Sequence, residues 1–269
     1  MKLINKFILT AVLALAGSAL LLSANAATVP FPTDGDLFMG FHSSSSTNEY
    51  LVDIGQFSLY DNKPVGFTLN LGNYSADLTT ALGSNWFSDI NAQWGVTGVL
   101  SATSQLWASK ATLVPGTAIP WTRQSTASQD NSGSTINTMV FGDYAGQTAT
   151  PNNPTGVIHS TSGLSWASFN NGSNSPGGSF NTWVPSIEGP QVPGLPGNSI
   201  TTSKLDLFRL DPNNNGQNLP GHYDGTFSID SLGNVTYTVV PEPSTYACLI
   251  AGAGLLFALL RFRSRSLKA

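Results

Sequence analysis

The sequence predicts a mainly β fold, a single exported β-sandwich-like domain with a few short helices. Two observations indicate this class. Apolar and polar residues alternate with period two at residues 65–71, 225–230 and 235–239, which is the pattern of strands that bury one face. The body of the chain is also rich in Ser, Thr, Asn and Gly and poor in charge, a composition common in exported β-proteins and uncommon in helical cytosolic enzymes.

The first 26 residues are predicted to be a secretory signal peptide. Lys2 and Lys6 give a basic start, residues 7–22 are apolar, and Ala24-Asn25-Ala26 supplies a small-x-small cleavage site. The alternative is a membrane anchor that is never cut, against which the cleavage site argues. Residues 27–240 are therefore interpreted as the exported domain.

Within this domain the residue patterns place most of the secondary structure. Strands are predicted at 36–42, 50–54, 65–71, 93–100 and 105–108, followed by a three-strand meander at 205–210, 225–230 and 235–239. A helix is predicted at 75–82, where Gly83 provides the stop, with a second short helical turn at 85–90. Residues 115–153 show no clear period, so only short helices are expected there. Glycine and proline make 170–198 a predicted loop.

The charge balance and the cysteine count narrow the possibilities further. Residues 27–240 hold five basic and 14 acidic side chains, a net charge of −9. Phosphate binding needs Lys and Arg, so nucleic acid and anionic membrane surfaces are excluded as partners. The only cysteine, Cys248, lies outside the domain, so burial alone must hold the fold. We expect the six tryptophans in the core, with an exposed sugar-stacking platform as the alternative: Trp86, Trp94, Trp107, Trp121, Trp166 and Trp183.

One polar segment partly matches a calcium-binding loop. Asp211, Asn213 and Asn215 precede Gly216 in the order D-x-[DN]-x-[DN]-G, which can wrap a calcium ion with side-chain oxygens. The twelfth position, where a bidentate Glu belongs, is His222. We interpret the segment as a polar turn, with a calcium site as the weaker alternative.

No pattern in the domain indicates catalysis. None of the histidines (His42, His159 and His222) has a partner at the spacing of a helical metal motif, and neither a G-x-S-x-G elbow nor a phosphate-binding loop occurs. Carboxylates that are close in sequence do not establish a glycosidase pair, which must face a cleft. No enzymatic activity and no cofactor are predicted. A glycan-binding module and an extracellular polysaccharide hydrolase remain the alternatives.

The end of the chain, residues 241–269, is the most specific feature. Its parts are a motif at 241–245 (Pro241, Glu242, Pro243, Ser244 and Thr245), an apolar segment at 244–260 and a basic end at 261–269 with Arg261, Arg263 and Arg265. Seventeen residues span about 25 Å as a helix, just enough to cross a bilayer core. The arginines should remain cytoplasmic and stop transfer, which leaves the domain outside the inner membrane.

This order of motif, apolar segment and terminal arginines resembles the PEP-CTERM sorting signal of Gram-negative bacteria. The resemblance implies export through the Sec translocon, anchoring by the C-terminal helix, and recognition by an exosortase, which removes the tail. It further implies a final location at the cell surface or in the extracellular matrix, with exopolysaccharide or biofilm as the associated material. The sequence thus predicts a non-enzymatic surface or matrix protein.

Overall fold

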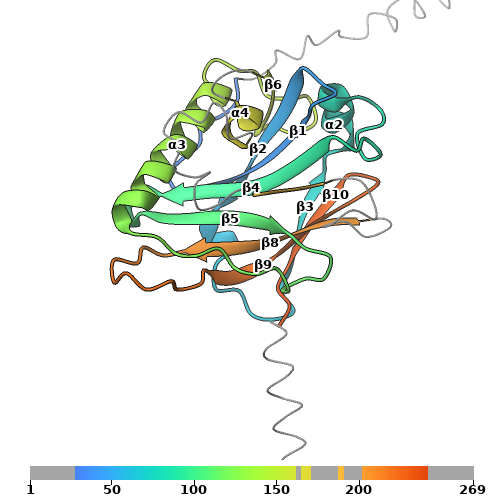
Figure 1. Ribbon diagram of the computed structural model, residues 1–269. Coiled ribbons are helices and arrows are strands. Elements are labelled where there is room, and N and C mark those ends of the chain that lie inside the picture. Colours follow the sequence, from blue (N-terminus) through green and yellow to red (C-terminus); the bar gives the residue numbers. More distant parts are fainter. Residues whose placement is uncertain (1–27, 162–164, 171–186, 191–201, 242–269) are drawn as a thin grey trace, which may run out of the picture.

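The computed structural model describes residues 28–161, 165–170, 187–190 and 202–241 (Figure 1). The predicted signal peptide and residues 242–269 lie outside these ranges. In the ranges that are described, no helix has the length and apolar character needed to cross a membrane. The predicted transmembrane segment at 244–260 is not among them.

The described residues form ten strands and a small number of helices. The strands are β1 (Asp36–Ser43), β2 (Asn48–Gln56), β3 (Thr68–Asn73), β4 (Ala92–Leu100), β5 (Gln105–Ala111), β6 (Gly156–Ser160), β7 (Glu188–Pro190), β8 (Thr202–Leu210), β9 (His222–Asp230) and β10 (Asn234–Thr238). The α-helices are α2 (Ser75–Leu82), α3 (Thr126–Tyr144) and α4 (Trp166–Asn170), and the single 3₁₀ turns are η1 (Phe57–Leu59) and η2 (Ser101–Thr103).

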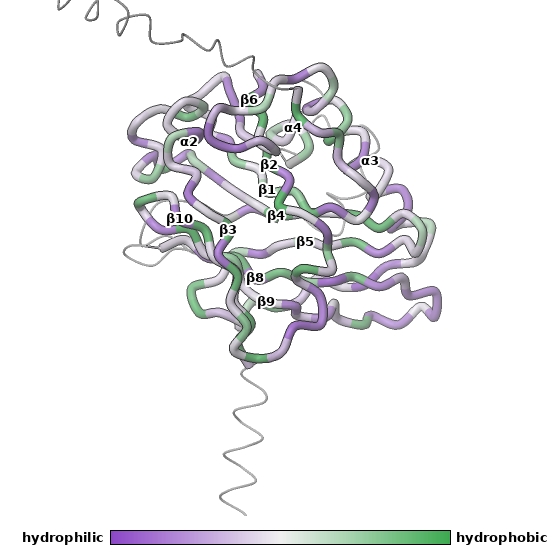
Figure 2. Tube along the Cα trace, turned by 180° about the vertical axis from the view of Figure 1, so that it is seen from behind, coloured by the Kyte–Doolittle hydropathy of each residue, from purple (hydrophilic) through white to green (hydrophobic). Residues whose placement is uncertain are grey.

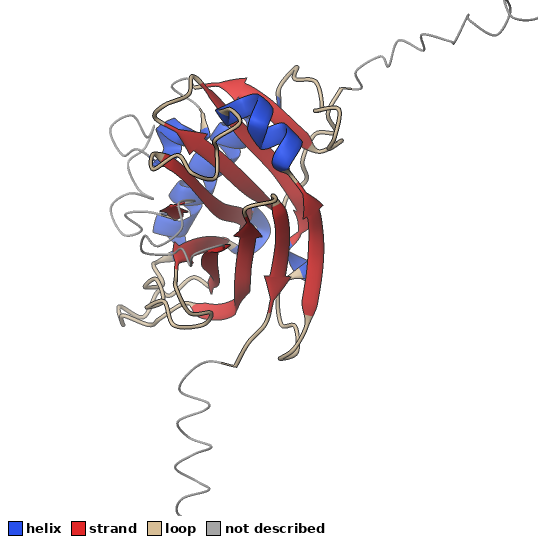
Figure 3. Ribbon diagram, turned by 90° about the vertical axis from the view of Figure 1, so that its right-hand side faces the viewer, coloured by secondary structure: helices blue, strands red, loops and turns tan. Residues whose placement is uncertain are grey.

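All ten strands belong to one antiparallel sheet. Its order is β3-β10-β9-β8-β5-β4-β1-β2-β6, and β7 adds to β4 beside β5. The mainly β class is therefore confirmed. The two stacked sheets of a sandwich are replaced by a single sheet that curls around its own core, as the side view in Figure 3 shows. The ladder between β5 and β8 joins the two halves of the sheet, so no second sheet separates.

The inside of the curl is filled by a large apolar cluster to which most strands and α2 contribute. Its largest fully buried side chains are Phe41, Tyr50, Tyr60, Trp94, Trp107, Phe227 and Tyr237. The alternation predicted for the last strands is confirmed, because Phe227, Ile229, Val235 and Tyr237 all belong to this cluster. The polar loop between β8 and β9 stands out as hydrophilic in Figure 2.

A second apolar cluster lies on the outer face of the sheet, under α3 and α4. It joins strand residues such as Phe38, Leu106 and Phe208 to helix residues such as Met139 and Trp166. Five of the six tryptophans lie in these two clusters and are at most 7% exposed, as predicted for core residues. Trp183 lies outside the described residues.

The Trp166 ring packs against the sheet at two glycines, which have no side chains to exclude it. Gly40 of β1 and Gly95 of β4 are directly paired across the ladder. A Cβ added to Gly40 would lie 2.0 Å from the Trp166 ring, and one added to Gly95 would lie 3.1 Å from it. The indole therefore packs against bare backbone, which fixes α4 on the sheet at this point.

Several predicted elements need correction. At 85–90 the predicted helical turn is present, because the Asn85 carbonyl accepts from the backbone N–H groups of Ser88 at 2.9 Å and Asp89 at 3.0 Å, but it does not extend into a helix. The strand predicted at 65–71 begins at Thr68, because Val65 is 62% exposed and contributes nothing to the core. β7, at Glu188–Pro190, lies within the segment predicted as a loop. By contrast, the helix predicted at 75–82 is confirmed, with Gly83 at φ +96° as its stop.

The largest correction is α3, a helix of 19 residues where only short helices were expected. Its sheet-facing side begins with polar and small residues, among them Gln129, Ser132 and Gly133. Gly133 allows the helix to approach Val99, which a Cβ would meet at 2.6 Å, and the Gln129 amide donates to two buried carbonyls. Such a buried face gives no period in hydropathy.

Asp224 of β9 is a buried carboxyl in the inner core. Its Oδ2 accepts a 3.0 Å hydrogen bond from the Trp107 indole N–H. Burial raises the pKa of Asp224 to about 7, the charge of Asp61 adds to this rise, and Arg209 opposes it. The folded protein therefore holds this proton more tightly than the unfolded chain, in which an Asp has a pKa of about 3.9.

Gly40→Ala should destabilise the protein by about 1–3 kcal/mol, because the added methyl collides with the Trp166 ring. Urea denaturation of the single variants and of the pair with Trp166→Leu measures the coupling between the two positions. The cost of Gly40→Ala should fall below about 0.5 kcal/mol when the indole is absent. If Gly40→Ala destabilised the wild type and the Trp166→Leu variant equally, the indole would not pack against Gly40.

Asp224→Asn should stabilise the protein relative to the wild type as the pH rises. The wild-type contribution is complete below about pH 4 and is lost as the pH rises through about 7, where the buried carboxyl must ionise. The asparagine keeps an acceptor for Trp107 and has no proton to lose. Denaturation from pH 4 to pH 8 should show the difference growing to roughly 1–3 kcal/mol. Parallel pH profiles for the two proteins would contradict the burial of this carboxyl.

Candidate functional site

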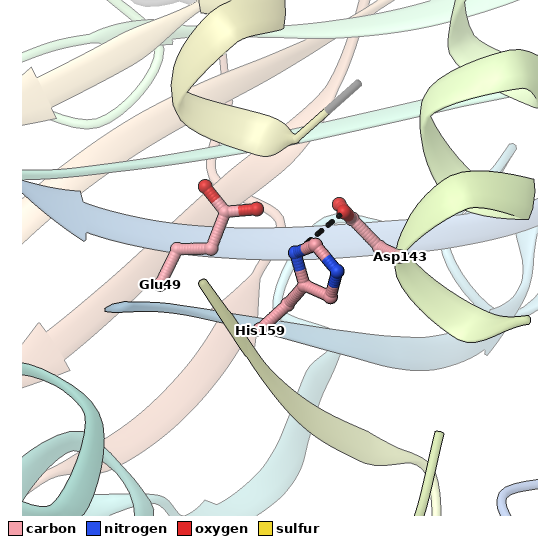
Figure 4. A group of neighbouring side chains, drawn as sticks. All are labelled: Glu49, Asp143 and His159. Atoms are coloured by element: carbon pink, nitrogen blue, oxygen red, sulfur yellow. Dashed lines mark ion pairs between the residues drawn. The ribbon is translucent and has the colours of Figure 1, made fainter. Parts of the chain in front are cut away.

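A buried group of two carboxylates and one imidazole lies between the outer face of the sheet and the helices. Glu49 of β2, His159 of β6 and Asp143 of α3 direct their side chains toward one another (Figure 4), and one ligand atom from each lies within 4.8 Å of the other two. Glu49 and His159 are direct partners in the β2–β6 ladder, and such partners project from the same face of a sheet.

Asp143 lies on the sheet-facing side of α3 because of its spacing from the buried apolar residues of that helix. Ile136, Met139 and Val140 form the buried apolar stripe of the second half of α3. Asp143 follows Ile136 by seven residues, which returns it to the same side of the helix. A carboxylate therefore occupies a position at which an apolar side chain would ordinarily meet the sheet.

Glu49 also anchors the start of α4. Its Oε1 accepts a 2.9 Å hydrogen bond from the backbone N–H of Trp166, and its Oε2 accepts one of 2.9 Å from that of Ala167. These are amide groups of the first turn, which a helix cannot satisfy internally. Burial raises the pKa of Glu49, and these two hydrogen bonds oppose the rise.

Asp143 is the least compensated group of the cluster. It is 0% exposed, and no hydrogen bond from the described residues reaches either of its carboxylate oxygens. Its nearest ionisable neighbour is His159, whose Nδ1 lies 3.6 Å from Oδ1 and is itself without a hydrogen bond. Burial raises the pKa of Asp143 to about 9, the adjacent charge of Glu49 adds to this rise, and the nearby backbone N–H of Trp166 opposes it.

A second buried acid lies on the other side of Trp166. The indole N–H donates a 2.7 Å hydrogen bond to Oε1 of Glu188, and Nε2 of His42 lies 2.9 Å from Oε2. Burial alone lowers the pKa of His42, but the hydrogen bond and charge of Glu188 reverse this and raise it overall. Both oxygens of Glu188 are thus engaged, unlike those of Asp143.

The structure gives the partial calcium motif the geometry of a polar turn. Oδ1 of Asp211 accepts from the Gln105 amide at 2.7 Å and lies 3.2 Å from Nε of Arg209. Oδ1 of Asn213 accepts from the backbone N–H of Asn215 at 3.2 Å. The side-chain oxygens of Asp211 and Asn213 are therefore directed at protein partners.

Of the predicted sorting residues, the structure describes only Pro241, which is partly exposed just beyond β10. Glu242, Pro243, Ser244 and Thr245 lie outside the described residues. The same is true of the predicted membrane-stop residues Arg261, Arg263 and Arg265. The part of the chain that carries the sorting prediction therefore has no described geometry.

Sequence analysis missed the cluster of Glu49, Asp143 and His159. Its members come from three distant segments and match no local motif. One signal was available in the helical spacing of Ile136, Met139 and Val140, which predicts that Asp143 faces inward. The pairing of β2 with β6 could not be read from either strand alone.

Comparison with models of known protein families finds no match, and searches of curated proteins and of solved structures find none either.

Glu49→Gln should destabilise the protein by about 1–3 kcal/mol. A glutamine has one acceptor oxygen, which can serve only one of the two backbone N–H groups of Trp166 and Ala167. Its NH₂ group then faces the second N–H, so a buried donor is left unsatisfied. Thermal or urea denaturation measures the loss. Asp130→Asn, on the exposed side of α3, removes the same charge and should change stability by less than about 0.5 kcal/mol. Similar effects of the two variants would contradict the capping role of Glu49.

Proposed function

We propose that residues 27–240 form a non-enzymatic surface or matrix protein of a Gram-negative envelope, delivered by exosortase processing of the tail at 241–269. The single observation that carries this proposal is the sequence of the tail, in which the Pro-Glu-Pro motif, an apolar segment and terminal arginines follow one another directly. The signal peptide at 1–26 adds the export step through the Sec translocon.

The boundary between fold and motif supports this division of the chain. The backbone N–H of Val239 donates a 3.0 Å hydrogen bond to the carbonyl of Phe67, and the Val239 carbonyl accepts one of 2.8 Å from Gly66. Pro241 follows two residues later and has no N–H with which to extend the ladder. Pro241, the first residue of the motif, therefore lies just beyond the last hydrogen bonds of the body.

On this proposal the apolar segment at 244–260 anchors the protein in the inner membrane until the tail is removed. The domain then associates with the cell surface or the extracellular matrix, where exopolysaccharide is its proposed partner. An acidic domain suits that setting, since its net charge of −9 keeps it soluble among anionic surfaces. Nucleic acid is not a partner on the same grounds.

The described residues give little support to the two alternative functions, a glycan-binding module and a polysaccharide hydrolase. A glycan-binding module needs exposed Trp or Tyr rings on one sheet face, whereas the five described tryptophans are at most 7% exposed and no described tyrosine is exposed. A glycosidase needs two carboxyls about 5–10 Å apart across an open cleft. Glu49 and Asp143 are both fully buried beneath helices, so this pair does not provide such a cleft.

Glu242→Ala should block processing of the tail. The intact mass of the protein from the surface fraction of its host should lack the C-terminal arginines in the wild type, and the variant should keep them and remain in the membrane fraction. Lys268→Ala, which alters the tail outside the motif, serves as the matched control and should be processed normally. A wild-type surface protein that still ends at Ala269, with or without the host's exosortase, would refute the proposal.

A further inference from the structure

Asp143 poses an electrostatic problem that the described protein atoms do not solve. A carboxylate that is removed from water costs several kcal/mol unless hydrogen bonds or an opposite charge replace its hydration. Glu188 receives such compensation from Trp166 and His42. Asp143 is as deeply buried and has a second carboxylate beside it. Among the described residues it has only the Trp166 backbone N–H, which does not reach it in hydrogen-bond geometry, and His159 at 3.6 Å. A bound cation would supply the missing compensation.

The distances favour shared coordination over a hydrogen bond between Asp143 and His159. Their N···O separation of 3.6 Å is too long for a hydrogen bond, which requires about 2.7–3.2 Å. Two ligands that each lie about 2.0–2.2 Å from one tetrahedral ion are about 3.4 Å apart. Figure 4 shows the Asp143 oxygen and Nδ1 of His159 facing one another, with the Glu49 carboxylate on the same side.

Glu49 can join this set without giving up its hydrogen bonds. The two carboxylate oxygens together have four lone pairs and accept from three donors, the backbone N–H groups of Trp166 and Ala167 and the Ser165 side chain. One lone pair therefore remains for a metal ion. Those two amides hold the carboxylate in place, as partners behind metal ligands ordinarily do. The three ligand atoms lie within 4.8 Å of one another, so small side-chain movements bring them to a common centre.

We propose that Glu49, Asp143 and His159 bind one divalent transition-metal ion, with Zn²⁺ as the ion that fits best. The imidazole ligand favours zinc and its neighbours over calcium and magnesium, which prefer six or more oxygens. Two carboxylates neutralise the charge of the ion, and a water molecule completes a four-coordinate site. The ion enters from the side of His159, whose side chain is 21% exposed on the edge strand β6.

Such an ion would join three parts of the fold that are distant in sequence. Glu49 contributes β2 and the start of α4, His159 contributes the edge strand β6, and Asp143 contributes the last turn of α3. The only cysteine lies in the tail, so no disulfide can do this in the exported domain. The site therefore acts as a structural cross-link, and its existence does not depend on how the tail is processed.

The test is metal binding by the purified protein after treatment with EDTA and dialysis. Titration with ZnCl₂ by calorimetry should show one ion bound per chain, accompanied by a rise in melting temperature. Asp143→Asn and His159→Ala should each weaken binding at least tenfold, on the order of a lost metal contact. His222→Ala, which removes an imidazole that is exposed and distant from the cluster in the β8–β9 region, should bind zinc like the wild type.

Cobalt provides a readout that does not depend on stability. Co²⁺ added to the metal-free wild type should produce visible absorption bands of a low-coordinate site, which His159→Ala abolishes and His222→Ala retains. The proposal is overturned if the wild type binds no zinc beyond the level of His159→Ala. It is also overturned if His222→Ala lowers binding as much as His159→Ala does, or if Ca²⁺ binds this cluster more tightly than Zn²⁺.

Discussion

The contact between Trp166 and the paired glycines Gly40 and Gly95 positions most of the outer face of the sheet. The ring lies where a Cβ on Gly40 would be, so the glycine pair allows α4 to approach the β1–β4 ladder closely at this point. In this position the backbone N–H of Trp166 donates to Glu49 and the indole N–H donates to Glu188. One residue thereby donates to two buried carboxylates, to Glu49 from its backbone and to Glu188 from its side chain. Its ring also packs in the apolar cluster under the helices.

The buried carboxylates make the outer layer specific at some cost in stability. Removing a charge from water is unfavourable, and an apolar replacement of the same shape often stabilises a protein. Here two of the carboxylates fix particular partners, because Glu49 binds the first turn of α4 and Glu188 binds His42. Asp143 lies 3.6 Å from His159 without a hydrogen bond. A domain without disulfides, whose longest helix is largely polar, gains from such directional contacts because apolar packing alone would not define its register.

The sequence allowed the prediction of elements whose chemistry is local. The meander at the end of the domain was predicted from the alternation of apolar and polar residues, and the apolar ones are buried. The end of α2 was predicted from Gly83. Features that depend on tertiary contact could not be predicted. α3 buries Gln129, Ser132 and Gly133 against the sheet, so its hydropathy has no period. The pairing of β5 with β8, which makes one curled sheet out of two expected layers, and the meeting of Glu49, Asp143 and His159 arise only from the assembled fold.

Hydrogen exchange at the backbone amides of Trp166 and Ala167 tests most directly whether Glu49 and the Gly40–Trp166 contact hold α4 on the sheet. Both amides should exchange as slowly as the β1 and β2 amides in the core, because their opening requires the indole to leave Gly40 and the carboxylate to leave the helix. Exchange at the rate of an exposed loop, while β1 and β2 remain protected, would show that α4 opens on its own and that Trp166 does not anchor it.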